Sequence, residues 1–126
     1  MTKAWDIGLA RVYDDPGAKQ GARLLVDCVW PRGIRRADLA LDDWIRKIAP
    51  SSDLRSWFGH DPDRWTEFRR LYRAELDAGG EALERCLAWC RKGPVTLLYG
   101  ARDDEHNQAV VLLEYLLERR TQVDAA

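Results

Sequence analysis

The chain has 126 residues, of which 46% are hydrophobic and 33% charged, and its formal net charge is −1. This balance excludes intrinsic disorder and provides no global basic field for nucleic acid, and the length predicts one domain over residues 1–126. No apolar run reaches the roughly 18 residues of a membrane span and no signal peptide opens the chain, which predicts a cytoplasmic protein with no membrane partner.

Two strands are expected near the start of the chain. Residues 5–13 and 22–30 are rich in aromatic and β-branched side chains. The short turn and loop over residues 14–21 separate them, so we expect these two strands to pair antiparallel. The second strand ends at Trp30-Pro31-Arg32-Gly33, because proline has no backbone N–H to donate and glycine allows a sharp turn.

The middle of the chain predicts helices. Ser51 and Asp61 are good N-cap residues, and Trp57 and Phe58 are expected to face inward from a short helix. The apolar residues of the segment 37–48 also alternate, but we interpret this segment as a helix. The four helices are expected over residues 37–48, 54–59, 62–78 and 81–91.

The last strand and the last helix flank a charged turn. The apolar run 95–99 leads through 100–104 into a helix over 105–120, and residues 121–126 are expected to fray. The long connection between the second and third strands predicts that they are parallel. The fold class is therefore α/β, with a compact single-layer sheet of about three core strands flanked by helices and mixed parallel and antiparallel pairing. Under this topology, the turns 30–33 and 100–107 share one cleft at the carboxyl ends of strands.

Several motifs follow one another over residues 8–119, and together they resemble the YeaO-like branch of the DUF488 family, a widespread bacterial family of unknown function. The resemblance implies a compact α/β domain and no established reaction. Cys28 stands where the family usually has a basic residue, so a ligand site that uses that side chain is altered here. A sister branch has cysteine beside its histidine where this chain has Asn107, which argues against thiol chemistry at that turn. The motifs are Val26-Asp27, Trp30-Pro31-Arg32-Gly33, Ala49-Pro50-Ser51, Trp57-Phe58-Gly59-His60-Asp61-Pro62, Tyr72-Arg73-Ala74-Glu75-Leu76, and Pro94-Val95-Thr96-Leu97-Leu98-Tyr99 with Asp103 and His106-Asn107.

The charged turn offers one candidate catalytic pair. Asp103 and His106 are three residues apart across a helix start and can face each other, and histidine is the natural proton carrier near neutral pH. In the alternative interpretation, Asp103 caps the helix while His106 and Asn107 hydrogen-bond the loop. Both interpretations stay open at this point.

His60 is the second candidate. It lies in a tight corner between two helices, where Asp61 is most simply explained as a cap. His60 and His106 are the two histidines of the chain, and both fall in turns, where functional side chains are often displayed. We therefore hypothesise that they line the same cleft.

Arginines supply candidate anion contacts. Arg32 could form a group with Arg11 and Arg23, because guanidinium matches carboxylate and phosphate geometry, although pairing with neighbouring aspartates explains them equally well. Trp30 adjoins Arg32 and is a candidate pocket wall, and Asn107 is a further candidate ligand contact. Arg35-Arg36 is better explained as a solvated face.

Metal and cofactor motifs are not recognised. Cys86 and Cys90 share a helical face with leucines and are expected to be buried free thiols, as is typical of cysteine in apolar surroundings. No metal-ligand set can be built by spacing. The chain also lacks a phosphate-binding glycine loop, a serine nucleophile elbow and a dinucleotide motif, so no cofactor is assigned.

These observations lead to two functional hypotheses. In the first, the cleft binds a small anionic or phosphorylated ligand; if it also catalyses, His106 is the acid or base, Asp103 orients it, Arg32 contacts the anion and His60 is a second polar group. In the alternative, the chain is a non-enzymatic docking module for a protein or nucleic acid, with arginines 32, 35 and 36 as a local basic patch.

Overall fold

A computed structural model describes residues 5–14 and 21–125, with side chains as far as residue 119. One sheet runs in the order β1-β4-β2-β3, and every pairing in it is parallel. The α/β class is confirmed, but the expected mixed sheet is wrong. The strand β4 lies between β1 and β2, so these two never pair with each other, and the turn expected over 15–20 lies outside the described residues. The strands are β1 (Ile7–Arg11), β2 (Ala22–Leu25), β3 (Asp43–Trp44) and β4 (Val95–Tyr99).

Strand β4 is the centre of the sheet. Leu97 stands opposite Leu9 of β1 on one side and Leu24 of β2 on the other. All five residues of β4 are buried. A continuous apolar run is what a central parallel strand requires, because both of its faces are covered. The parallel pairing of the second strand with the strand over 95–99 is confirmed.

Helices α1 to α4 and three 3₁₀ turns make up the remaining regular structure. The Ser51 side chain accepts a hydrogen bond from the backbone N–H of Leu54, and that of Asp61 accepts one from Asp63, which confirms both expected caps. Trp57 was expected inward but is 38% exposed, because its neighbour Phe58 takes the buried face of α1. The elements are η1 (Arg36–Asp38), η2 (Arg46–Ile48), α1 (Ser52–Phe58), η3 (Pro62–Arg64), α2 (Trp65–Asp77), α3 (Glu81–Lys92) and α4 (Gln108–Ala125).

Two further expectations about helices are wrong. Residues 37–48 form η1, β3 and η2 instead of a helix, because β2 takes the backbone N–H groups of Asp42 and Ile45 at 2.9 and 3.0 Å. Helix α4 begins at Gln108 and not near residue 105, since the Asp103 side chain accepts the backbone N–H groups of Glu105 and His106 and holds them in a turn. Its backbone continues to Ala125, where fraying was expected.

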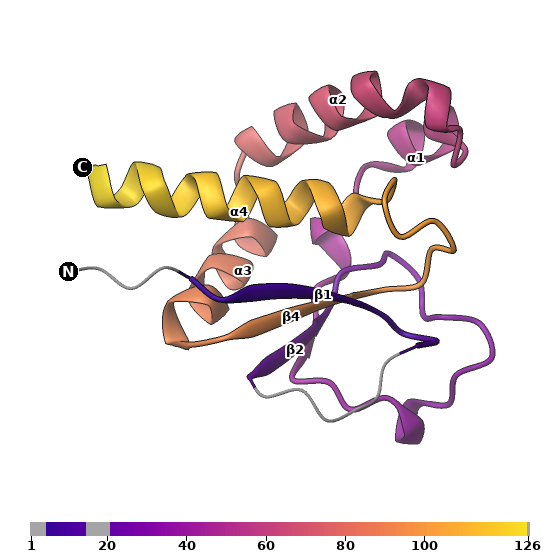
Figure 1. Ribbon diagram of the computed structural model, residues 1–126, viewed down its shortest axis with the longest axis horizontal. Coiled ribbons are helices and arrows are strands. Elements are labelled where there is room, and N and C mark those ends of the chain that lie inside the picture. Colours follow the sequence, from indigo (N-terminus) through magenta and orange to yellow (C-terminus); the bar gives the residue numbers. More distant parts are fainter. Residues whose placement is uncertain (1–4, 15–20, 126) are drawn as a thin grey trace.

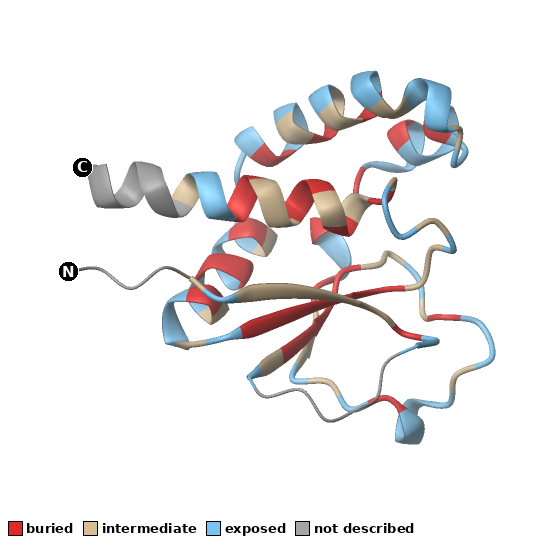
Figure 2. Cartoon of the chain, in the orientation of Figure 1, coloured by how far each residue is buried: buried red, intermediate tan, exposed pale blue. Residues whose placement is uncertain are grey.

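The four helices lie on one face of the sheet, and the segment 28–42, which contains η1, crosses the other (Figure 1). The main core forms between the sheet and the helices, and the buried stripes of those helices face it (Figure 2). The alternation of side chains along β4 separates the two cores, with Leu97 in the main core and Leu98 in the smaller one.

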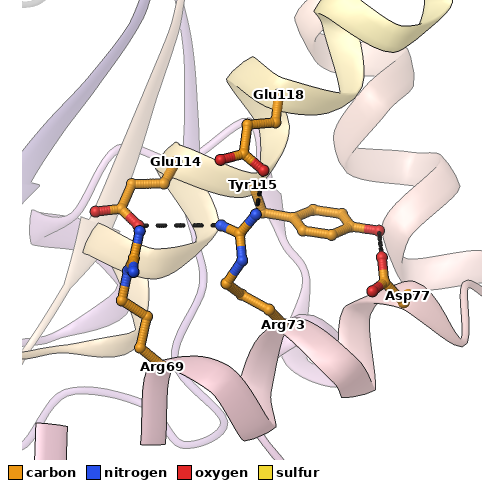
Figure 3. A network of polar contacts seen from close by, with 6 residues as sticks. All are labelled: Arg69, Arg73, Asp77, Glu114, Tyr115 and Glu118. Carbon is orange, nitrogen blue, oxygen red and sulfur yellow. Dashed lines mark hydrogen bonds and ion pairs between the residues drawn. The ribbon is translucent and has the colours of Figure 1, made fainter. Parts of the chain in front are cut away.

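A polar network joins α2 to α4 (Figure 3). Arg69 pairs with Glu114 at 2.7 Å, and Arg73 pairs with Glu118. The buried Tyr115 donates its hydroxyl to Asp77 at 2.9 Å. These contacts fix α2 across α4 and thereby the position of the α1–α2 corner. None of the helices in the described part of the chain is long and apolar enough to cross a membrane.

Candidate functional site

A cavity of about 450 Å³ opens at the carboxyl ends of the strands. Because the strands are parallel, β1, β2 and β4 all end at this edge, and the segments that follow them meet there. The Pro50–Phe58 segment and the start of α4 close the other sides. The size falls within the usual range of small-molecule sites, which is roughly 300–1,000 Å³.

The walls of the cavity are largely apolar. Phe58 and Phe68 stack at a ring distance of 4.1 Å and form one wall with the main core behind them. Trp30 also lines the cavity, and its indole N–H donates to the carbonyl of Ile34 at 2.6 Å. Such a bond holds the indole in place. The other apolar lining residues are Val29, Pro31, Ala49, Pro50 and Ala101.

Asp27 lies on the floor of the cavity. One carboxylate oxygen accepts the backbone N–H of Gly100 at 2.8 Å, and the other accepts the side-chain amide of Gln108. A Cβ at position 100 would stand 3.0 Å from the same Asp27 oxygen, so glycine allows this close approach. Each carboxylate oxygen keeps further acceptor capacity, which a ligand N–H or O–H group can use.

Burial raises the pKa of Asp27 from 3.8 to about 6. The hydrogen bonds from Gly100 and Gln108 and the charge of His60 act in the opposite direction, and burial outweighs them. A carboxyl group held this way costs stability at neutral pH. Perturbed groups of this kind in a cavity are typical of functional sites.

Three side chains with basic groups line the cavity: Arg32, Arg55 and His60. The Arg55 guanidinium is positioned by a bond from its Nε to the carbonyl of Pro50 at 3.1 Å. The Tyr13 hydroxyl donates to the backbone carbonyl of Arg32 at 2.7 Å, and this bond does not involve the Arg32 side chain. Among the described lining residues, Asp27 is the one carboxylate, so the cavity carries an excess of positive charge.

His60 has a backbone conformation that L-residues rarely adopt. Its φ is +57°, directly after Gly59 with a φ of +52°. The corner therefore turns through two successive left-handed residues, and only at Gly59 is this free of steric cost. The histidine ring lies 6.1 Å from the ring of Phe58 and lines the cavity.

The turn before α4 is built by the predicted pair. Asp103 accepts the backbone N–H groups of Glu105 and His106, and its other oxygen lies 2.8 Å from His106 Nδ1. These bonds lower the pKa of Asp103. The buried Asn107 donates its side-chain amide to the Asp103 carbonyl, and its oxygen accepts the backbone N–H of Val110. Asp103 therefore stabilises the turn and does not cap the helix as the alternative interpretation expected; the side chain that caps α4 is Asn107.

The two histidines contact different rings of one aromatic cluster. The His106 ring stands edge-on to Trp65 at 5.2 Å, and Trp65 lies 6.1 Å from Phe58, whose other neighbour is His60. The cavity is lined by His60 and Asn107 but not by His106 or Asp103.

The strand arginines do not join Arg32. Arg11 donates to the carbonyl of Ala101 at 2.9 Å, pairs with Asp14 at 3.5 Å, and so supports the turn after β4 from outside the cavity. Arg23 is 6% exposed and donates to the carbonyl of Ala40 at 2.7 Å. Both have structural partners of the kind that the sequence analysis considered as an alternative.

A second hollow of about 750 Å³ adjoins the first. The two share the residues Cys28, Ala49, Pro50 and Arg55. The second hollow lies between η2, the start of α1 and the start of α3, and its cations are Arg46, Lys47, Arg55 and Arg85.

No metal centre is evident, since the described residues contain no group of three histidine, cysteine or acidic side chains close enough to bind one ion. Cys86 and Cys90 are buried free thiols, as expected, and burial raises their pKa values to about 12 and about 11. Protonated thiols of this kind are poor nucleophiles and poor metal ligands. Cys28 is half-buried and lines both hollows.

Three lining residues with charged or amide side chains were not proposed as site residues from the sequence, although one of them, Asp27, belongs to a family motif: Asp27, Arg55 and Gln108. A signal for Asp27 was present, because it follows the apolar run 24–26 at the end of a strand, where ligand-contacting residues are common. Arg55 lies in a predicted helix and Gln108 in a predicted helical turn, and no local pattern separates them from ordinary surface residues.

Comparison with known proteins gives consistent relatives. A family model described as the inactive DUF488-N3 subclade matches residues 6–126. The uncharacterised protein YeaO of Escherichia coli is 41% identical over 111 residues, which cover 88% of this chain and 96% of YeaO. The uncharacterised protein Rv3073c of Mycobacterium tuberculosis is 35% identical over 116 residues, covering 92% of this chain and 98% of its own length. No solved structure gives a significant match. The chain therefore belongs to the DUF488 family, as a YeaO-like member that matches its inactive DUF488-N3 subclade.

Proposed function

We propose that this protein is a non-catalytic binding domain that holds a small anionic ligand in the cavity at the carboxyl ends of its strands. The observation that carries the proposal is the pairing of an apolar, aromatic-walled cavity with the guanidinium groups of Arg32 and Arg55. Guanidinium provides the planar, two-pronged donor geometry that carboxylates and phosphates accept.

The charges around the cavity support an anion over a cation. No described carboxylate lies within ion-pair distance of the Arg32 or Arg55 side chains, so neither charge is neutralised within the described part of the chain. The apolar walls reduce the local dielectric screening, which strengthens their attraction for a bound anion.

The matching family model is described as an inactive subclade, which supports binding over catalysis. The engagement of Asp103, His106 and Asn107 in the turn before α4 supports the same choice, since all three side chains have structural partners there. The catalytic role considered for His106 and Asp103, and the cytoplasmic location, stay predictions.

The docking alternative rests on arginines 32, 35 and 36 as a basic patch. Arg35 pairs with Asp38 at 2.9 Å, and Arg36 lies over the rings of Trp30 and Trp44 at 4.6 and 5.2 Å. Two of the three arginines therefore already have intramolecular partners. This weakens the patch as a site for a polyanion and favours the cavity.

The test is a thermal-shift screen against inorganic phosphate, sugar phosphates, nucleotides and small carboxylates. A ligand at about 100 times its dissociation constant stabilises the folded state by roughly 2.7 kcal/mol, which raises Tm by about 10 °C in a domain of this size. The screen is repeated with Arg32→Ala and Arg55→Ala, and with Arg35→Ala as a charge-matched control.

The proposal expects at least one anion to raise Tm, with the shift lost in Arg32→Ala and Arg55→Ala and kept in Arg35→Ala. No shift with any anion would contradict it. A shift that disappears in Arg35→Ala and weakens steeply with salt would instead support the docking alternative.

A further inference from the structure

We infer that the ligand is a nucleoside polyphosphate. Its base lies in the 450 Å³ cavity above Asp27, called the inner cavity below, and its phosphates extend past Arg55 into the adjoining 750 Å³ hollow, called the outer hollow. This inference rests on the proposed function and names the chemical class of its ligand. The two hollows differ in chemical character, and Arg55 lines both of them.

The inner cavity selects a flat group with hydrogen-bond donors. Phe58, Phe68 and Trp30 supply aromatic walls, against which a heterocycle packs with little loss of conformational entropy. The floor is rich in acceptors: the Asp27 carboxylate uses one acceptor site per oxygen on Gly100 and Gln108, and the Gln108 amide oxygen is an acceptor as well. A bare phosphate has neither a flat ring nor an N–H group to offer this cavity, and a sugar phosphate has hydroxyl donors but no flat ring, whereas a nucleobase has both a flat ring and N–H groups.

The outer hollow favours negatively charged groups. Its cations are Arg46, Lys47, Arg55 and Arg85, and among its described lining residues Glu81 is the one acid. Arg85 is paired with Asp43, and Arg46 lies 4.8 Å over the ring of Trp44. Lys47 has no carboxylate within ion-pair distance among the described residues. The charge left unneutralised is suited to more than one phosphate.

Arg55 connects the two hollows. It is one of the residues that line both, and the bond from its Nε to the Pro50 carbonyl fixes the guanidinium at the boundary. A phosphate attached to the sugar of a base in the inner cavity would reach this boundary first. Further phosphates then extend toward Lys47, away from the Asp27 carboxylate that would repel them.

The experiment compares three probes by isothermal titration calorimetry: ATP, inorganic tripolyphosphate and ribose 5-phosphate, with GTP, CTP and UTP as base variants. Tripolyphosphate matches the charge of ATP without a base, and ribose 5-phosphate has one phosphate and no base. Three proteins are compared with the wild type: Asp27→Asn, the double variant Arg46→Ala/Lys47→Ala, and Arg35→Ala as a control on a neighbouring surface.

The inference expects at least one nucleoside triphosphate to bind at least about tenfold more tightly than either probe without a base, because tripolyphosphate makes no bonds to the cavity floor and ribose 5-phosphate has no ring to pack against the aromatic walls. Asp27→Asn should weaken that nucleotide about tenfold and leave tripolyphosphate binding unchanged or tighter, since the substitution removes both an acceptor and a negative charge. Arg46→Ala/Lys47→Ala should weaken nucleoside triphosphate and tripolyphosphate together. Arg35→Ala should change neither.

The alternative outcomes separate the two proposals. If simple phosphates bind through Arg32 and Arg55 and no nucleotide binds better, the nucleotide inference is wrong and the anion-binding proposal stands. If no anion binds, both are wrong. If triphosphates bind equally to wild type and to Arg46→Ala/Lys47→Ala, the path of the phosphates into the outer hollow is refuted. Circular dichroism of each variant confirms that a lost interaction does not reflect unfolding.

Discussion

Replacing Asp27 by asparagine should stabilise the protein at neutral pH. The folded-state pKa of Asp27 is raised by burial from 3.8 to about 6, and at about 1.4 kcal/mol per pKa unit this rise corresponds to about 3 kcal/mol. Asparagine is neutral at every pH and nearly the same shape. At pH 8 the variant should therefore exceed the wild type in unfolding free energy by up to about 3 kcal/mol.

The direction of this pH dependence follows from proton uptake at Asp27. Between pH 3.8 and about 6 the folded protein binds more protons at Asp27 than the unfolded chain, so stability rises as the pH falls through this window. The advantage of Asp27→Asn should shrink over the same window and nearly vanish at about pH 4. Urea unfolding followed by tryptophan fluorescence at pH 4, 5, 6, 7 and 8 measures it.

The exposed Asp53→Asn is the matched control and should show no gain at neutral pH. A difference between Asp27→Asn and wild type that stays constant from pH 4 to pH 8 would refute the reasoning. So would a loss of stability at pH 8, because it would mean that the charged carboxylate contributes more through its bonds to Gly100 and Gln108 than burial costs.

Three further predictions concern stability. His60→Gly should be about 1 kcal/mol more stable than His60→Ala in urea unfolding, because glycine alone adopts the φ of +57° without a steric cost; equal stabilities would contradict the strained corner. Gly100→Ala should cost about 1–3 kcal/mol, since the new Cβ would press against Asp27 at 3.0 Å, and the loss should be smaller in the Asp27→Ala background, as a double-mutant cycle would show. Tyr115→Phe should cost about 1 kcal/mol through its lost bond to Asp77, and an unchanged unfolding free energy would mean that this α2–α4 contact contributes nothing (Figure 3).

Local chemistry predicts much of this fold. The caps at Ser51 and Asp61 follow from side-chain oxygens placed one residue before a helical turn, and the apolar run 95–99 follows from a strand covered on both faces. The bonds between Asp103 and His106 likewise follow from their spacing of three residues. Each of these features is encoded by residues that are close to one another in the sequence.

Sheet order and the cavity floor depend on distant residues, and local patterns do not reach them. The short connection between the first two strands predicts a hairpin. In the structure both strands instead pair with the apolar β4, which begins about 70 residues after the end of β2. Asp27 becomes a floor residue because β2 and β4 are neighbours and bring Gly100 within 2.8 Å of it. The prediction of a helix over 37–48 is wrong for the same reason, since pairing with β2 overrides a partial helical pattern.

The most direct test of the central claim is a two-dimensional ¹H–¹⁵N NMR titration of the labelled protein with inorganic phosphate, ribose 5-phosphate and ATP. The account predicts saturable shifts in at least one titration, centred on the amides of Gly100, Ala101 and Gln108 and on the Nε–H of Arg55. Saturable shifts centred on Arg35 and Arg36, or no saturable shift with any of the three compounds, would contradict the claim that this cavity binds a small anion.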